Sequence, residues 1–154
     1  MVRVLFLCHG NICRSPMAEF VMRDLIFKAG LSDSVSVASA AVTTVEIGND
    51  IHYGTRRKLR EMGIPFSPRS AWLVRRADLD AYDYVIIMDE ENRYHLRRMF
   101  GDEVARSTPL LLSFAGEDRD IADPWYTGNF DETYEDVLRG CRALLKKIQA
   151  DCAR

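Results

Sequence analysis

The chain carries a cysteine and an arginine at a spacing that suits phosphate chemistry. Five residues separate Cys8 from Arg14, and Ser15-Pro16 follow at once. Proline suits the first turn of a helix, and N–H groups of a loop that enters a helix bind anions. Arg14 adds a planar cation that matches two phosphate oxygens, and the same field favours a thiolate. The stretch therefore predicts a nucleophilic sulfur inside a phosphate cradle, and so attack on phosphorus.

Three neighbouring side chains are candidates for supporting this sulfur. Ser15 could donate its hydroxyl to Cys8, or it could simply cap the helix. Asn11 tolerates the left-handed backbone that such a loop needs. Its amide could also brace the loop, with Ser39 as a partner.

Cleavage of an oxygen ester also needs a proton for the leaving group. Asp123 is the best candidate, because Pro124 restricts its backbone and Trp125 and Tyr126 could wall a pocket. An ordinary Asp-Pro turn is the competing interpretation. Other acids could serve instead: Asp89, Asp118 and Asp120.

The remaining cysteines and the histidines give weaker signals. Cys13 could form a reversible disulfide with Cys8, or it could only pack; Cys141 suits the core and Cys152 a frayed terminus. We expect reduced thiols. We expect no metal site, because there is no CxxC pair and the histidines lie far apart in sequence: His9, His52 and His95.

The elements that must position these residues alternate along the chain. Apolar runs predict strands at 2–7, 34–40, 84–88 and 108–112, and helical spacing predicts helices at 17–29, 51–62, 90–100 and after a cap at Asp131. Segment 113–130 is predicted to be a long loop. This alternation indicates a doubly wound α/β fold with helices on both faces of a parallel sheet. Ligands bind at the carboxyl ends of such strands, where Cys8 and Asp89 lie.

Length and charge narrow the possibilities. The 154 residues favour a single domain spanning 1–154. The formal charge of −2 gives no general attraction to nucleic acid. The apolar runs are too short to span a bilayer, and no signal-peptide pattern precedes the first strand. We therefore expect a cytoplasmic protein, with its oligomeric state left open.

The motifs resemble the low-molecular-weight protein tyrosine phosphatase family over nearly the whole chain. Further landmarks lie at 39–41, 46–48, 63–65 and 88–90. The resemblance implies a three-layer fold with a four-stranded parallel sheet, a cysteinyl-phosphate intermediate and no metal or cofactor. It makes Cys8 the nucleophile, Arg14 the phosphate-binding residue and Asp123 the general acid, then base. It implies phosphotyrosine-containing proteins as substrates, and as substrate-binding or supporting residues His9, Gly10, Asn11, Ile12, Cys13, Ser15, Trp125, Tyr126 and Ser39.

Three positions bear on specificity within that family. Ile12 matches the tyrosine-phosphatase branch, whereas the arginine-phosphatase branch tends to carry threonine there. Val45 stands where many members have an aromatic residue in the substrate cleft. A histidine that often lies near Pro68 and pairs with the acid at Asp89 is missing. The wall of the pocket and the role of Asp89 therefore stay open.

Other functions were weighed against phosphotyrosine hydrolysis. A thiol-dependent arsenate reductase shares this scaffold but relays electrons through further cysteines in mid-chain, and there is none between Cys13 and Cys141. A protein arginine phosphatase is the second alternative. A phosphate-binding module has no need for a thiolate, and a phosphocysteine carrier has no need for a leaving-group acid.

Overall fold

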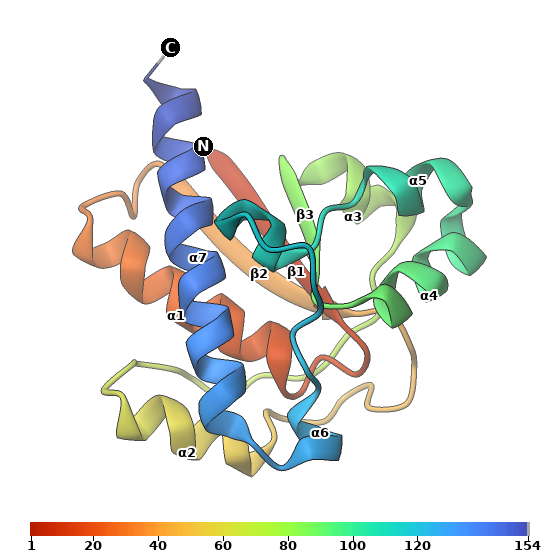
Figure 1. The fold of residues 1–154 in the computed structure, drawn as a ribbon, viewed down its shortest axis with the longest axis horizontal. Helices are drawn as coiled ribbons and strands as arrows, with labels where there is room; N and C mark the ends of the chain where they lie inside the picture. The colour runs from red at the N-terminus through yellow and green to blue at the C-terminus, as the bar shows by residue number, and fades with distance from the viewer. Residues whose placement is uncertain (154) are drawn as a thin grey trace.

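A parallel sheet forms the centre of the computed structural model, which describes residues 1–153 (Figure 1). Its strands lie in the order β2–β1–β3, with bounds β1 Val2–Cys8, β2 Val35–Ala41 and β3 Tyr84–Ile87. Leu5 of β1 pairs with Ala38 on one side and Val85 on the other. The apolar run before Cys8 is therefore the central strand.

Helices cover both faces of the sheet, as predicted (Figure 1). Val4 and Phe6 pack on the face covered by α1 Arg14–Lys28 and α7 Phe130–Cys152, with α2 Tyr53–Glu61 alongside. Leu5 and Leu7 pack on the opposite face, where Leu96 contributes from α4 Glu90–Phe100. That side also carries α3 Arg76–Ala81 and α5 Asp102–Ser107. Alternate side chains of β1 thus face two separate cores, which makes the three-layer arrangement.

The fourth predicted strand, at 108–112, is wrong. Leu110 makes a single isolated parallel bridge with Ile87, and the chain then turns into the short 3₁₀ helix η1 Leu111–Ala115. Pro109 accepts from Ile87 N at 3.0 Å but has no N–H to continue a ladder. A short buried apolar run does not distinguish a strand from a buried helical turn. The described residues therefore form three strands rather than four.

Two predicted helix caps are also wrong. Ser15 lies inside the first turn of α1, whose N-cap is Cys13, so its hydroxyl is free for another partner. Asn129 caps α7 by accepting from Glu132 N at 3.0 Å, whereas Asp131 bonds Lys58 at 2.8 Å.

The predicted loop 113–130 contains the end of η1 and a short helix, α6 Pro124–Thr127. Cys141 is fully buried in the core, as predicted. Cys152 is the last residue of α7 and is exposed. Among the described residues, no helix is both long and apolar enough to cross a bilayer.

Candidate active site

The site begins at the carboxyl end of the central strand. Cys8 is the last residue of β1 and is 2% exposed. The loop that follows is tied to the end of β2, since the carbonyls of Cys8 and His9 accept from Val42 N at 3.0 Å and Thr43 N at 3.1 Å. Within the loop Asn11 has φ 62°, the left-handed conformation that asparagine tolerates. The chain then enters α1 at Arg14.

The Cys8 sulfur is surrounded by donors from the first turn of α1. Its Sγ lies 3.0 Å from Ser15 Oγ, and Ser15 N donates to it at 3.4 Å. Asn11 Nδ2, which can only donate, bonds Ser15 Oγ at 2.8 Å. This leaves the Ser15 proton available to the sulfur. Ser15 thus supplies two hydrogen-bond donors to the sulfur at the amino-terminal end of α1.

The Asn11 amide connects the loop to the rest of the site. Nδ2 also donates to Ser39 Oγ at 3.0 Å. Oδ1 accepts from Arg69 Nη2 at 2.7 Å and from Trp72 N at 3.4 Å. Because both of those partners are donors, they determine which end of the amide is the oxygen. The Asn11 amide therefore links Ser15, Ser39 and Arg69 through hydrogen bonds.

Arg69 also contacts the loop, and sequence reasoning did not single it out. Its guanidinium also donates to the carbonyls of Asn11 and Ser39, both at 3.1 Å, and its Nε lies 3.7 Å from Glu19 Oε1. Burial lowers the pKa of Arg69, and Glu19 partly offsets this effect. The sequence did offer one signal for Arg69. It follows Pro68 directly, close to the position where many family members have a histidine that this chain lacks.

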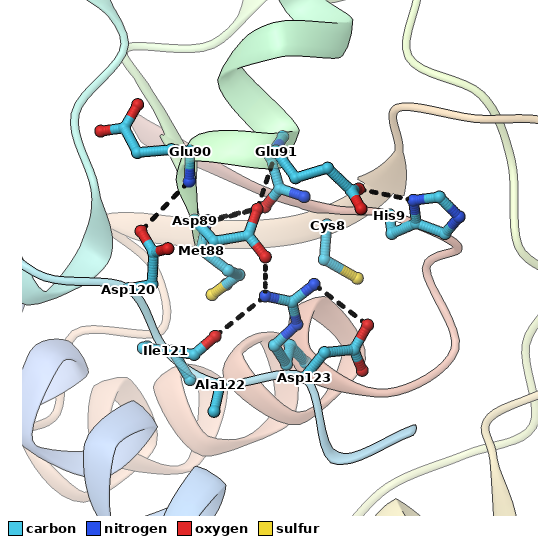
Figure 2. Close-up of polar contacts among 12 residues, drawn as sticks. Cys8, His9, Met88, Asp89, Glu90, Glu91, Asp120, Ile121, Ala122 and Asp123 are labelled. Atoms are coloured by element: carbon cyan, nitrogen blue, oxygen red, sulfur yellow. Dashed lines mark hydrogen bonds and ion pairs between the residues drawn. The ribbon is translucent and has the colours of Figure 1, made fainter. Parts of the chain in front are cut away.

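Arg14 is 1% exposed and is held between the carboxylates of Asp89 and Asp123. Figure 2 shows these two carboxylates on either side of the site. Nη1 donates to Asp89 Oδ2 at 2.5 Å and to the Ile121 carbonyl at 2.9 Å, and Nη2 lies 3.4 Å from Asp123 Oδ2. Burial opposes the charge, but Cys8, Asp89 and Asp123 outweigh it and raise the pKa of Arg14. Its Nε has no hydrogen-bond partner among residues 1–153. Asp89 thus pairs with this arginine.

Asp123 combines the two interpretations of its Asp-Pro sequence. It is the N-cap of α6, where Oδ1 accepts from Trp125 N at 3.0 Å. Its other carboxylate oxygen faces Arg14. Of the competing acids, Asp120 bonds Glu90 N at 3.1 Å beside Asp89, and burial, followed by Asp89, raises the pKa of Asp120. Asp118 is exposed and does not line the pocket.

These groups line a pocket of about 190 Å³ with Cys8 and Arg14 among its walls. Val45, Trp125 and Tyr126 are exposed residues of the lining. His52, which sequence reasoning missed, supports Trp125 edge-on at 5.6 Å between ring centroids and stacks on Phe130 at 5.4 Å. The other lining residues are His9, Gly10, Ile12, Cys13, Glu46 and Asp123.

Two further lining residues have distinct partners. His9 Nδ1 lies 2.7 Å from Glu91 Oε1 of α4. Cys13 is a buried free thiol, and burial, followed by the nearby Cys8, raises its pKa. The structure therefore brings all the predicted catalytic and loop residues to one place, with the aromatic pair beside them.

Comparisons with known proteins agree with this geometry. A family model described as low molecular weight phosphotyrosine protein phosphatase matches residues 3–154. The low molecular weight protein-tyrosine-phosphatase YfkJ of Bacillus subtilis is 46% identical over 154 residues, covering 98% of each chain. Its crystal structure superimposes with a TM-score of 0.92 at 45% identity, covering 98% of this chain and 96% of that one. SP-PTP, a low molecular weight protein tyrosine phosphatase from Streptococcus pyogenes, gives 0.85 at 36% identity, with 96% and 93% covered.

Proposed function

The chain belongs to the low molecular weight phosphotyrosine protein phosphatase family, and from this premise we propose that it hydrolyses phosphotyrosine in proteins through a phosphocysteine at Cys8. One observation carries the proposal. The Cys8 sulfur, the Arg14 guanidinium and the Asp123 carboxyl line a single pocket. A nucleophile, a phosphate-binding cation and a proton donor are the three groups that the reaction requires.

In the first step the thiolate attacks phosphorus. The S–P bond forms while the bond from phosphorus to the phenolic oxygen breaks. Asp123 gives its proton to that departing oxygen. Arg14 and the loop N–H groups stabilise the charge that builds on the equatorial oxygens.

In the second step water releases the phosphate. The Asp123 carboxylate takes a proton from a water molecule while the oxygen of that water attacks phosphorus. The S–P bond breaks, inorganic phosphate leaves, and Ser15 stabilises the returning Cys8 thiolate. As written, neither step requires a metal or cofactor.

The state of Arg14 supports phosphate as the natural occupant. A buried donor without an acceptor is costly, and Arg14 Nε is such a donor among the described residues. A phosphate oxygen would supply the acceptor. Asp89 would hold the other side of the guanidinium in place throughout the reaction.

The depth of the pocket favours aryl phosphates. Cys8 is almost fully buried, so a phosphate must enter deeply to meet the sulfur. The ring of phosphotyrosine would span this depth against Trp125 and Tyr126, whereas phosphoserine is shorter. Val45 offers only an aliphatic contact where many members of the family have an aromatic residue, so we infer weaker stacking on that side.

The arsenate-reductase alternative loses support from the positions of the remaining thiols. Cys141 is buried in the core and Cys152 ends α7. Neither offers the mobile mid-chain thiol that reduction of arsenate would need.

The cytoplasm remains our predicted location, and residues 1–154 our predicted single domain.

The test is a panel of matched peptides carrying phosphotyrosine, phosphoserine or phosphoarginine. We expect the highest kcat/KM for phosphotyrosine. We also expect no turnover by Cys8→Ser, which should still bind phosphate. A preference for phosphoarginine would support the arginine-phosphatase alternative, and an active Cys8→Ser variant would remove the nucleophile assignment.

A further inference from the structure

Two histidines and a glutamate from separate parts of the chain converge beside the pocket. His9 follows the nucleophile in the loop, and Glu91 and His95 lie one turn apart on α4. His9 Nδ1 is 2.7 Å and His95 Nε2 is 3.6 Å from Glu91 Oε1. We propose that His9, Glu91 and His95 bind a divalent transition-metal ion, Zn²⁺ above all, at the rim of the phosphate pocket.

The donor set suits this ion. Two imidazole nitrogens and one carboxylate oxygen are a common set of protein ligands for Zn²⁺ that leaves a fourth position for water. One ligand atom from each of the three residues lies within 4.8 Å of the other two. Figure 2 shows the Glu91 carboxylate and the His9 ring directed toward each other.

Binding would require local adjustment of the three ligand distances. Metal–ligand bonds of about 2.0–2.2 Å at tetrahedral angles place ligand atoms roughly 3.3 Å apart. The His9–Glu91 contact of 2.7 Å would open by about 0.6 Å and the His95–Glu91 contact of 3.6 Å would close by about 0.3 Å. The two histidine nitrogens, which lie within 4.8 Å of each other, would approach by at most about 1.5 Å. The Glu91 side chain is 48% exposed, so it is free to make this movement.

The fold holds the ligands in place before any ion arrives. The i, i+4 spacing puts Glu91 and His95 on one face of α4. The rings of His9 and His95 meet edge-on at 5.7 Å, and Tyr94 packs against His95 at 5.3 Å. His9 and His95 lie far apart in sequence, which had argued against a zinc site. They meet in the structure because His9 follows β1, His95 lies on α4 after β3, and β1 and β3 are paired strands.

Occupancy would reach the catalytic loop through His9. The His9 carbonyl accepts from Thr43 N at 3.1 Å and Thr43 Oγ1 at 2.9 Å, and its side chain lines the pocket. A bound ion would therefore tie α4 to the residue next to Cys8. The binding itself does not rest on the proposed function, because phosphotyrosine hydrolysis as written needs no ion.

Zn²⁺ affinity is the direct measurement, made by competition with a chromophoric chelator on the full, tag-free chain. The Cys152→Ser background removes the exposed thiol as a binding site. We expect one Zn²⁺ per chain and at least about a tenfold loss of affinity in His95→Gln, since even outer partners of a metal site cost that much. Glu90→Gln is the matched control on the same helix, because its carboxylate bonds Arg93 instead.

Two further readouts separate this site from other causes. Zn²⁺ should raise the melting temperature of the parent chain but not of His95→Gln, because binding only the native state stabilises it. Co²⁺ should bind without a thiolate-to-metal charge-transfer band. Unchanged Zn²⁺ affinity in both His95→Gln and Glu91→Gln would overturn the proposal. So would a charge-transfer band that disappears in Cys8→Ser, which would place the ion on the nucleophile.

Discussion

Replacing Arg69 by methionine tests whether this residue positions the phosphate-binding loop. Methionine keeps an unbranched apolar stem of similar reach but removes every donor. The change deletes the hydrogen bonds to the Asn11 carbonyl, the Asn11 side chain and the Ser39 carbonyl. Trp72 N remains near Asn11 Oδ1 at 3.4 Å, so one acceptor keeps a partner.

The size of the effect follows from these losses. The carbonyls of Asn11 and Ser39 would lose these partners, and an acceptor left alone costs about 1–3 kcal/mol when buried, here about 1.5 kcal/mol each because both sites are partly buried. With one acceptor still partnered, we expect a loss of about 3 kcal/mol in the free energy of unfolding. For a domain of this size that lowers the melting temperature by about 6–12 °C. Misplacing Asn11, and through it Ser15, should lower kcat by about 10²-fold.

The assay is aryl phosphate hydrolysis well below the melting temperature of every variant, with kcat and KM measured separately. Arg23→Met is the matched control, since Arg23 also bonds Glu19, at 2.9 Å, but is half exposed and does not contact the loop. An exposed pair of this kind contributes about 0–1 kcal/mol, so kcat should stay unchanged there. Arg69→Lys should recover part of kcat.

A folded Arg69→Met enzyme with the parent kcat would refute the reasoning. In that outcome Arg69 would only stabilise the fold, and the left-handed conformation of Asn11 would be maintained by the loop itself. A fall in kcat shared equally by Arg23→Met would instead move the effect to Glu19.

The remaining predictions concern the acid, the second loop thiol and one surface carboxylate. Asp123→Ala should slow the release of poor leaving groups far more than good ones, because only poor ones need a proton; equal slowing across a series of aryl phosphates would exclude it as the acid. Peroxide should inactivate the enzyme in a way that added thiol reverses, through a Cys8–Cys13 disulfide, and Cys13→Ala should make the loss irreversible; identical recovery in both would contradict the pairing. Hydrogen bonds from Arg69 N and Ile51 N hold the pKa of Asp50 below its usual 3.8. That stabilisation is present above the ordinary value and is lost as the pH falls through the lowered one. Asp50→Ala should therefore be less stable than the parent at neutral pH, with the difference in melting temperature shrinking in acid.

Local features were readable from the sequence because their physics is local. The loop from Cys8 to Ser15 lies between a buried strand and a helix start, and its residue types demand a particular backbone. Asp123 was recognisable for the same reason, because Pro124 follows it directly. The segments that form β1 and β3 are apolar runs that are long or rich in β-branched residues, so the sequence predicts a strand for each of them.

Features that depend on distant partners were not readable. The side chains of Leu111 and Leu112 can be buried equally well in a strand or in a 3₁₀ turn. Packing against α7 decides between these two conformations. Gly140 of α7 makes this possible, since a Cβ there would lie 2.6 Å from Leu111 Cγ. His52 contacts Trp125, and Arg69 contacts Asn11. The two residues of each pair lie far apart in sequence, so no rule about sequence spacing predicts either contact.

The outer edge of β2 shows a second consequence of the Arg69 position. Residues 37, 39 and 41 direct their backbone groups away from β1, where an unpaired edge invites strand addition and aggregation. Arg23 bonds the Val37 carbonyl and Arg69 the Ser39 carbonyl. Ala41 is bonded by Trp72 O at 2.7 Å and Val74 N at 2.9 Å. The Arg69 side chain, which contacts the phosphate-binding loop, therefore also occupies one of the acceptors through which a neighbouring strand could add to this edge.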